Sequence, residues 1–100
     1  MIIAKFKRSK GKLTGFSVSG HSGFSEAGSD IVCASVSSAV MLICNAITEV
    51  YKLNAKIEAG DNVISCDCPD GEKLIEALRL HLSALSEDYP ENISLKISEV

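Results

Sequence analysis

The feature that most constrains the fold is a long helical repeat of apolar residues between about residues 30 and 52. Apolar side chains recur there at spacings of four and three, the repeat that aligns them on one face of an α-helix. At ~1.5 Å per residue such a helix is roughly 34 Å long, so it spans a small domain. Ser29 or Asp30 is a suitable N-cap, because either side chain can accept from the first unpaired N–H groups. The expected buried stripe is Val32, Val36, Val40, Ile43, Ile47 and Val50.

Shorter patterns on both sides of this helix predict five strands and a second helix. The strands show alternation of apolar and polar residues, with Gly11 placed for the turn between the first two. The order ββαββαβ predicts an α+β fold, with a five-stranded, largely antiparallel or mixed sheet and both helices packed on one face. The expected strands are residues 2–8, 13–20, 55–59, 62–68 and about 93–97, and the second helix is residues 71–86.

The composition is that of one globular domain over residues 1–100. Hydrophobic residues make up 46% of the chain and charged residues 23%, which argues against disorder. We expect no membrane span, because no apolar run approaches the ~20 residues that cross a bilayer. The opening stretch MIIAKFKRSK has its apolar residues before its charges, the wrong order for a secretory signal. These features predict a cytoplasmic protein whose four cysteines are free thiols.

The net charge of −3 hides a strongly basic N-terminal quarter. Five basic residues and no acidic residue precede Glu26, so residues 1–25 carry +5, and the remaining five bases and thirteen acids give −8. Two interpretations are open: a solvated hairpin tip, or a patch that contacts ribosomal RNA or another acidic partner. The five basic residues are Lys5, Lys7, Arg8, Lys10 and Lys12.

Three of the four cysteines read as packed thiols rather than metal ligands. Cys66 and Cys68 are two residues apart on a predicted strand, so both side chains point to the same face. A structural zinc site needs a second pair of ligands at short spacing, and none is seen, so we expect no metal. Cys44 is interpreted as a packed thiol, and His81 as a structural histidine near the edge of an apolar stripe.

Cys33 and His21 differ from these residues in their setting. Cys33 lies in the first turn of the long predicted helix, where unpaired N–H groups lower the pKa of a thiol. The same N–H groups can hold the oxyanion formed on an attacked carbonyl. His21 follows a strand and begins a glycine-containing loop that can bring its imidazole to Cys33. A Cys–His pair is the minimum arrangement for an activated thiol nucleophile.

The string GHSGFSEAGSDIVCASVS resembles the signature of the bacterial ribosomal-processing cysteine protease family called Prp. That signature reads G-H, a short loop, G-x-D-I-V-C-A, and then S, and this chain matches it at each position. The resemblance extends through the order of strands and helices and the chain length. The matching residues are Gly20, His21, Gly28, Asp30, Ile31, Val32, Cys33, Ala34 and Ser37.

The resemblance implies an endopeptidase that removes a short N-terminal extension from the large-subunit ribosomal protein numbered twenty-seven, cutting after aromatic residues. It implies Cys33 as nucleophile, His21 as general base, a homodimer and no cofactor. Gly20 and Gly28 would bracket a mobile loop, and two further residues, Asp30 and Ser37, would support the site.

The roles of the two supporting residues stay open at this point. Asp30 is either a helix cap or a group that orients His21, since one carboxylate cannot serve both geometries at full strength. Ser37, one helical turn after Cys33, either bonds near the thiolate or returns its hydroxyl to the Cys33 carbonyl. We also expect the loop that contains Gly23 and Phe24 to be open without substrate and to close over it.

Two other function classes compete with the protease hypothesis. A non-catalytic ribosome-assembly or RNA-binding protein would use the basic hairpin and would tolerate loss of the Cys33 thiol. A redox sensor at Cys33 would need a resolving cysteine, and none stands close to it in the sequence. Substitution of Cys33 separates the protease from the binding protein.

Overall fold

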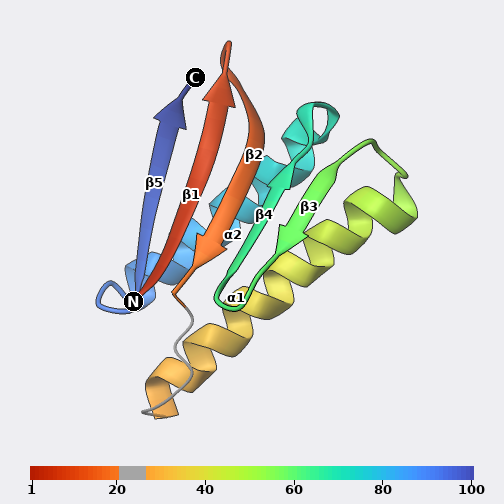
Figure 1. Cartoon of the computed structure of the whole chain (residues 1–100). Coiled ribbons are helices and arrows are strands. Elements are labelled where there is room, and N and C mark those ends of the chain that lie inside the picture. Colours follow the sequence, from red (N-terminus) through yellow and green to blue (C-terminus); the bar gives the residue numbers. More distant parts are fainter. Residues whose placement is uncertain (21–26) are drawn as a thin grey trace.

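The chain folds into one sheet with two helices on one of its faces (Figure 1). The computed structural model describes residues 1–20 and 27–100, with side chains from residue 31 onward in the second range. The predicted ββαββαβ order is confirmed. The elements are β1 (Ile2–Ser9), β2 (Lys12–Ser19), α1 (Ala27–Asn45), the π-helix η1 (Ala46–Val50), β3 (Lys56–Ala59), β4 (Val63–Asp67), the 3-10 turn η2 (Pro69–Gly71), α2 (Glu72–Asp88) and β5 (Ile93–Glu99).

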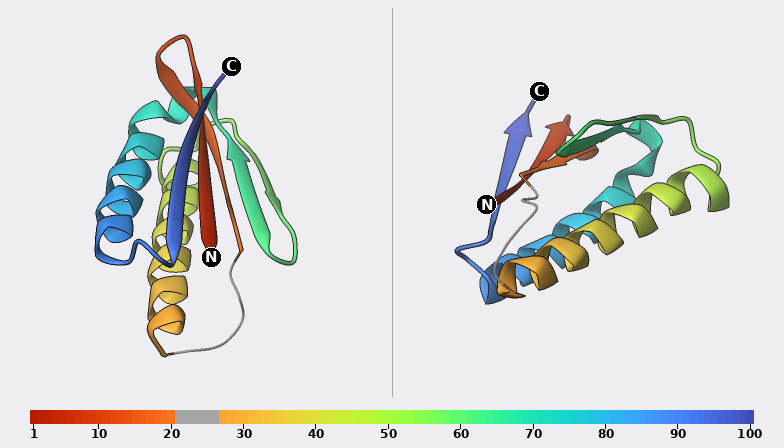
Figure 2. Two further views of the ribbon diagram at one scale, coloured as in Figure 1. Left: turned by 90° about the vertical axis from the view of Figure 1, so that its left-hand side faces the viewer. Right: turned by 60° about the horizontal axis from the view of Figure 1, so that its bottom comes forward.

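The sheet is mixed, with strand order β3-β4-β2-β1-β5. β1 pairs with β5 in parallel, and the other three pairings are antiparallel. Lys10 and Gly11 both have positive φ, so Gly11 lies in the tight β1–β2 turn that the sequence predicts. Figure 2 shows α1 and α2 side by side beneath the sheet, with the other face of the sheet uncovered.

The core lies between the sheet and the two helices. Phe6 and Phe16 face each other across β1 and β2, with ring centroids 6.3 Å apart. From α1 and η1, five residues of the predicted stripe are buried against this layer, and from α2 the residues Ile75, Leu78 and Leu82. The five residues are Val32, Val36, Val40, Ile43 and Ile47.

The prediction that Val50 is the last buried residue of the stripe is wrong, since Val50 is 71% exposed. The helix changes to π geometry over η1, where the N–H of Tyr51 bonds to the Ala46 carbonyl five residues earlier. A π turn adds a residue to the helical repeat and therefore rotates the following side chains away from the core. The stripe consequently ends at Ile47.

The start of α1 also differs from the prediction. The helix begins at Ala27, about three residues before the predicted start, so Ser29 and Asp30 lie inside its first turn and neither is the N-cap. Periodicity marks a helix only from its first apolar core residue, here Val32, and a polar first turn leaves no such signal. Acidic residues are favourable in a first turn because of the helix dipole.

The expectation that no apolar run approaches the length of a membrane span is wrong for the segment Ile31–Val50. By length and composition alone it is long and apolar enough to cross a membrane, with a mean hydropathy of 2.0. One face of this helix nevertheless forms part of the core, where Val36 and Ile47 are fully buried. Its outward face exposes Ile31, Met41 and Leu42 to solvent. The segment thus has a high mean hydropathy because apolar residues occupy both its core-facing stripe and its exposed outward face.

Candidate active site

Cys33 lies on α1 at a corner of the molecule. The N-terminal turns of α1 extend past the edge of the sheet, close to the end of β2 and the β3–β4 turn (Figures 1 and 2). The Cys33 side chain is half-buried and packs against the edge of the core. Ser37, one turn later on the same flank of the helix, is half-buried as well. The nucleophile candidate is therefore held by a rigid element and stays accessible.

The earlier start of α1 moves Cys33 from the first turn of the helix to the second. Only the first four N–H groups of a helix are unpaired, and these belong to residues 27–30. The prediction that Cys33 itself lies in the first turn is thus wrong. Because side chains on a helix lean toward its N-terminus, the thiol is still directed toward that first turn.

Gly20 fixes the direction in which the chain leaves β2. Its φ of +88° is a conformation that favours glycine, and a Cβ atom here would collide with the carbonyl oxygen of Met1. Its N–H donates to the Asn62 carbonyl at 3.1 Å, which ties the end of β2 to the β3–β4 turn. The residue before His21 is therefore locked in place between the start of β1 and the β3–β4 turn.

Several predicted site residues lie outside the described part of the structure. His21, Gly23 and Phe24 belong to residues 21–26, so the Cys33–His21 contact and the loop hypothesis stay predictions. The backbone of Gly28 and Asp30 belongs to the first turn of α1, about one turn before Cys33. Since Asp30 is not the N-cap, its role as an orienter of His21 stays a prediction, as does the role of Ser37.

An apolar cavity of about 230 Å³ has Ser37, one helical turn after Cys33, in its wall, and sequence analysis did not locate it. It opens between α1 and the β3–β4 end of the sheet, and Ser37 contributes to its wall. Three separate chain segments form it, namely β2, α1 and the β3–β4 hairpin, so no local motif predicts it. The lining residues are Val18, Val36, Ser37, Val40, Met41, Ala59, Gly60, Asp61, Val63 and Ile64.

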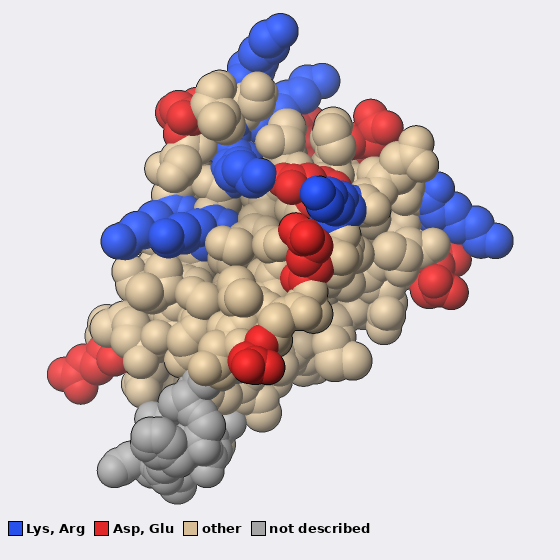
Figure 3. All heavy atoms as spheres, in the orientation of Figure 1, with Lys and Arg blue, Asp and Glu red and all other residues tan. Residues whose placement is uncertain are grey.

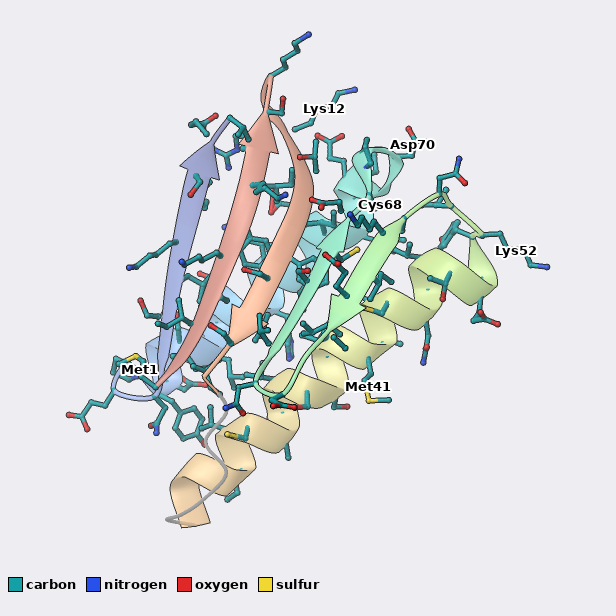
Figure 4. All side chains as sticks on the ribbon, in the orientation of Figure 1. Met1, Lys12, Met41, Lys52, Cys68 and Asp70 are labelled. Atoms are coloured by element: carbon teal, nitrogen blue, oxygen red, sulfur yellow. The ribbon has the colours of Figure 1, made fainter. Side chains whose placement is uncertain are left out.

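The other three thiols are confirmed as packed groups. Cys66 and Cys68 are buried, and Cys68 points into the layer between sheet and helices (Figure 4), while half-buried Cys44 packs against the core. Burial, with smaller contributions from neighbours including Cys44, raises the pKa of Cys66 to about 12. Burial also raises the pKa of Cys44 and of Cys68. These thiols stay protonated at neutral pH and are poor nucleophiles.

Two further predictions concern metals and His81. Among the described residues, no group of three or more His, Cys, Asp or Glu side chains is placed to hold a metal ion. His81 is exposed at the groove between α1 and α2, so its assignment as a packed structural histidine is wrong. It occupies the edge of the α2 stripe, and this edge faces solvent at the groove that α1 and α2 line together.

Known proteins share this sequence pattern and fold. The family model described as cysteine protease Prp matches residues 1–94. The ribosomal processing cysteine protease Prp of Bacillus subtilis is 28% identical over 93% of this chain and 94% of its own length. Its counterpart in Staphylococcus aureus is 31% identical over 86% and 88%.

Solved structures extend the comparison. SMU.848 from Streptococcus mutans has a TM-score of 0.90 and 30% identity, and covers 100% of this chain and 99% of its own. The essential ribosomal processing protease Prp from S. aureus, solved with a substrate peptide, has a TM-score of 0.89 and 25% identity over 98% and 100%. The chain therefore belongs to the cysteine protease Prp family and is a cysteine endopeptidase.

Proposed function

We propose that the chain removes the N-terminal extension of large-subunit ribosomal protein twenty-seven by cleavage after aromatic residues, with Cys33 as nucleophile and His21 as general base. The observation that carries this proposal is the position of Cys33. It is half-buried on α1, one helical turn before Ser37 of the apolar cavity, and Gly20, the residue before His21, is held at the end of β2 by its bond to Asn62. The relatives named for ribosomal processing support the substrate class.

Peptide cleavage by this pair uses the Cys33 thiol as nucleophile and the His21 imidazole as the group that carries the proton. Cys33 gives its proton to His21, and the sulfur attacks the carbonyl carbon before the scissile bond. His21 passes this proton to the departing amine as the C–N bond breaks, which leaves a thioester on Cys33. Water then gives a proton to His21 and attacks the thioester, and the released sulfur takes the proton back. Unpaired N–H groups of the first α1 turn are the nearest candidates to hold the oxyanion.

Purified variants test the assignment. Wild type, Cys33→Ala and His21→Ala are each incubated with the aromatic-containing N-terminal segment of the ribosomal protein, and the products are weighed by mass spectrometry. Cys44→Ala is the matched control, because Cys44 is a half-buried thiol on the same flank of the same helix. We expect one cut by wild type and Cys44→Ala and none by the other two. Cleavage by Cys33→Ala would overturn the proposal.

The proposal includes a homodimer in the cytoplasm. Ile31, Met41 and Leu42 on the outward face of α1 are each about 60% exposed or more, an apolar surface that favours association. The four free thiols suit a reducing compartment. Leu42→Glu is expected to convert the dimer to a monomer in sedimentation velocity, and a monomeric wild type would contradict this part of the proposal.

A second candidate function is contact of the basic hairpin with ribosomal RNA. Figure 3 shows Lys and Arg side chains gathered toward the β1–β2 turn on the open face of the sheet. Lys7 pairs with Asp67 at 2.5 Å and Arg8 with Glu99 at 3.5 Å, so RNA contact would rest chiefly on three exposed residues. These are Lys5, which pairs in register with Lys96, and the turn residues Lys10 and Lys12.

Like charges directly opposite one another are unfavourable unless an anion lies over them, which favours the RNA interpretation over a merely solvated tip. Charge reversal of Lys10 and Lys12 is expected to weaken association with ribosomes at low salt, measured by co-sedimentation. Unchanged association would reject this contact, and cleavage of the free peptide by the same variant tests the protease separately.

A further inference from the structure

The open face of the sheet carries a row of polar residues that crosses four neighbouring strands. Lys96 of β5 is paired in register with Lys5 of β1, and Lys5 is paired with Ser17 of β2. Ser17 in turn is paired with Ser65 of β4. Paired residues share one face of a sheet, and Phe16, which precedes Ser17, is buried on the other face. These four residues, here called the Lys–Ser row, extend over about 14 Å, since neighbouring strands lie ~4.8 Å apart.

The charges of the Lys–Ser row are positive and adjacent. The register partners of Lys5 are Lys96 and Ser17, and neither of them offsets its charge. Among the residues that the structure describes, neither Lys5 nor Lys96 forms an ion pair. The neighbouring Lys7 does form one, with Asp67 on the same face. The row therefore presents two uncompensated ammonium groups side by side.

Acidic residues gather in the helix layer, on the opposite side of the molecule. α2 carries four acidic and two basic residues, and residues 31–45 of α1 carry no charged side chain. On the open face, the acidic side chains Glu58 and Asp67 lie on β3 and β4, away from β1 and β5. Figure 3 shows Lys and Arg side chains on the β1–β5 side of this face. This distribution of charge turns the β1–β5 side of the open face toward a polyanion.

The residue types of the open face suit the backbone of a nucleic acid rather than its bases. Lysine ammonium and serine hydroxyl groups are common partners of phosphate and sugar oxygens. Proteins that bind single-stranded RNA instead stack its bases on exposed aromatic side chains. On the five strands, which lie wholly within the described residues, the aromatic residues are Phe6 and Phe16, and both face the core.

We propose that the Lys–Ser row binds the backbone of double-stranded RNA, with the two ammonium groups on phosphates and the two hydroxyls on phosphate or 2′-hydroxyl oxygens. The inference rests on the proposed contact of the basic hairpin with ribosomal RNA, and adds to it the residues, the mode of binding and the class of RNA. Cys33 lies on α1, on the other side of the sheet, so RNA on the open face leaves the thiol accessible to a peptide.

Fluorescence anisotropy with a labelled RNA hairpin tests the proposal. The stem has about 16 base pairs of mixed sequence, the length that a domain reading RNA shape and backbone can span. The double variant Lys5→Gln/Lys96→Gln removes both charges of the row. The matched control is Lys52→Gln/Lys73→Gln, which removes two exposed lysines from the helix layer and its end. Circular dichroism checks that the variants fold.

We expect Lys5→Gln/Lys96→Gln to bind the stem about 100-fold more weakly at about 50 mM salt, since each phosphate contact contributes about tenfold there. The slope of log Kd against log salt is expected to fall by about 2, one for each lost contact. The control is expected to keep the affinity of wild type within about twofold. Wild-type affinity and slope in Lys5→Gln/Lys96→Gln would overturn the assignment of the row, even if charge reversal at the turn weakens binding.

Further outcomes separate this inference from the proposals on which it rests. Wild type that binds a single strand of the same sequence as tightly as the stem would overturn the class of RNA. Wild type that prefers vesicles of anionic phospholipid to the stem would overturn RNA as the partner. Wild type that binds neither RNA would overturn the hairpin contact and the row together. Wild type that binds the stem but does not cleave the free peptide would overturn the protease proposal alone.

A second variant keeps the test decisive if Lys5→Gln/Lys96→Gln does not fold. Ser17→Glu places a carboxylate beside Lys5, its register partner, and so offsets one charge of the row without removing a lysine. We expect the stem to bind about tenfold more weakly. Ala84→Glu adds the same charge at an exposed position of α2 and is expected to bind like wild type. Unchanged affinity in Ser17→Glu would overturn the placement of RNA over the row.

Discussion

The most informative perturbation of the site geometry is Gly20→Ala, because Gly11 supplies a matched control. Both glycines have positive φ, +88° at Gly20 and +81° at Gly11. A Cβ at Gly11 has no atom within 4 Å, whereas at Gly20 it collides with the Met1 carbonyl oxygen. The two substitutions therefore share the conformational cost and differ in the steric one.

The expected magnitudes follow from this difference. An L-residue with a side chain costs about 1–2 kcal/mol in the left-handed region, and this is the whole expected loss for Gly11→Ala. At Gly20 the first residues of β1 must also move, an overpacking cost of about 1–3 kcal/mol more. The total of roughly 2–5 kcal/mol is a large part of a typical stability of about 5–15 kcal/mol.

Urea unfolding of the three proteins measures the free energies of unfolding. Displacement of Gly20 also displaces the residue after it, the candidate general base. We therefore expect kcat/KM on the aromatic-containing N-terminal segment of the ribosomal protein to fall about 100-fold, because small misplacements of catalytic groups cause losses of that size. Gly11→Ala is expected to keep wild-type kcat/KM, since its turn lies at the other end of the hairpin. Equal stability losses in the two variants would refute the collision with Met1.

Three further outcomes follow from the packing and the thiol environments. Gly15→Ala is expected to lower the free energy of unfolding by about 1–3 kcal/mol, because its Cβ would lie 2.7 Å from an Asp67 carboxylate oxygen; an unchanged urea midpoint would contradict this. Cys66 is expected to resist iodoacetamide in the native protein at pH 8, since a pKa raised from 9.0 to about 12 lowers its thiolate fraction about a thousandfold; peptide mapping that finds rapid alkylation would refute it. Ile47→Ala is expected to cost about 2–5 kcal/mol and Val50→Ala about 0.5 kcal/mol or less in urea unfolding, and similar losses would contradict the rotation introduced by the π turn.

Most of the fold could be predicted because the spacing of apolar residues along a helix or strand indicates which of its faces is buried. The stripe from Val32 to Ile47 and the inward row at Cys66 and Cys68 are examples. The spacing of apolar residues does not indicate which strands are neighbours, so the sequence does not predict the parallel pairing of β1 with β5. The same spacing does not indicate a change from α-helix to π-helix, and for this reason the predicted face of Val50 is wrong.

The site divides in the same way between local and tertiary information. The motif around Cys33 is local in sequence and identifies the nucleophile candidate without a structure. The cavity beside it depends on α1, β2 and the β3–β4 hairpin meeting at one corner, and no single segment carries that information. The exposure of His81 is tertiary information as well, because the edge of a helical stripe is buried or exposed according to where the neighbouring helix packs.

The four cysteines are all free thiols, but they differ in burial and in position. Cys66 and Cys68 face the core from the sheet, and half-buried Cys44 packs against its edge, where burial opposes formation of the charged thiolate and raises the pKa of each. Cys33 is half-buried on the second turn of α1, one turn before Ser37 of the cavity wall. Its neighbours on the helix, Val32 and Val36, are fully buried in the core. A thiol carried by a helix that is packed in this way is held in a fixed position, which is what a nucleophile candidate needs.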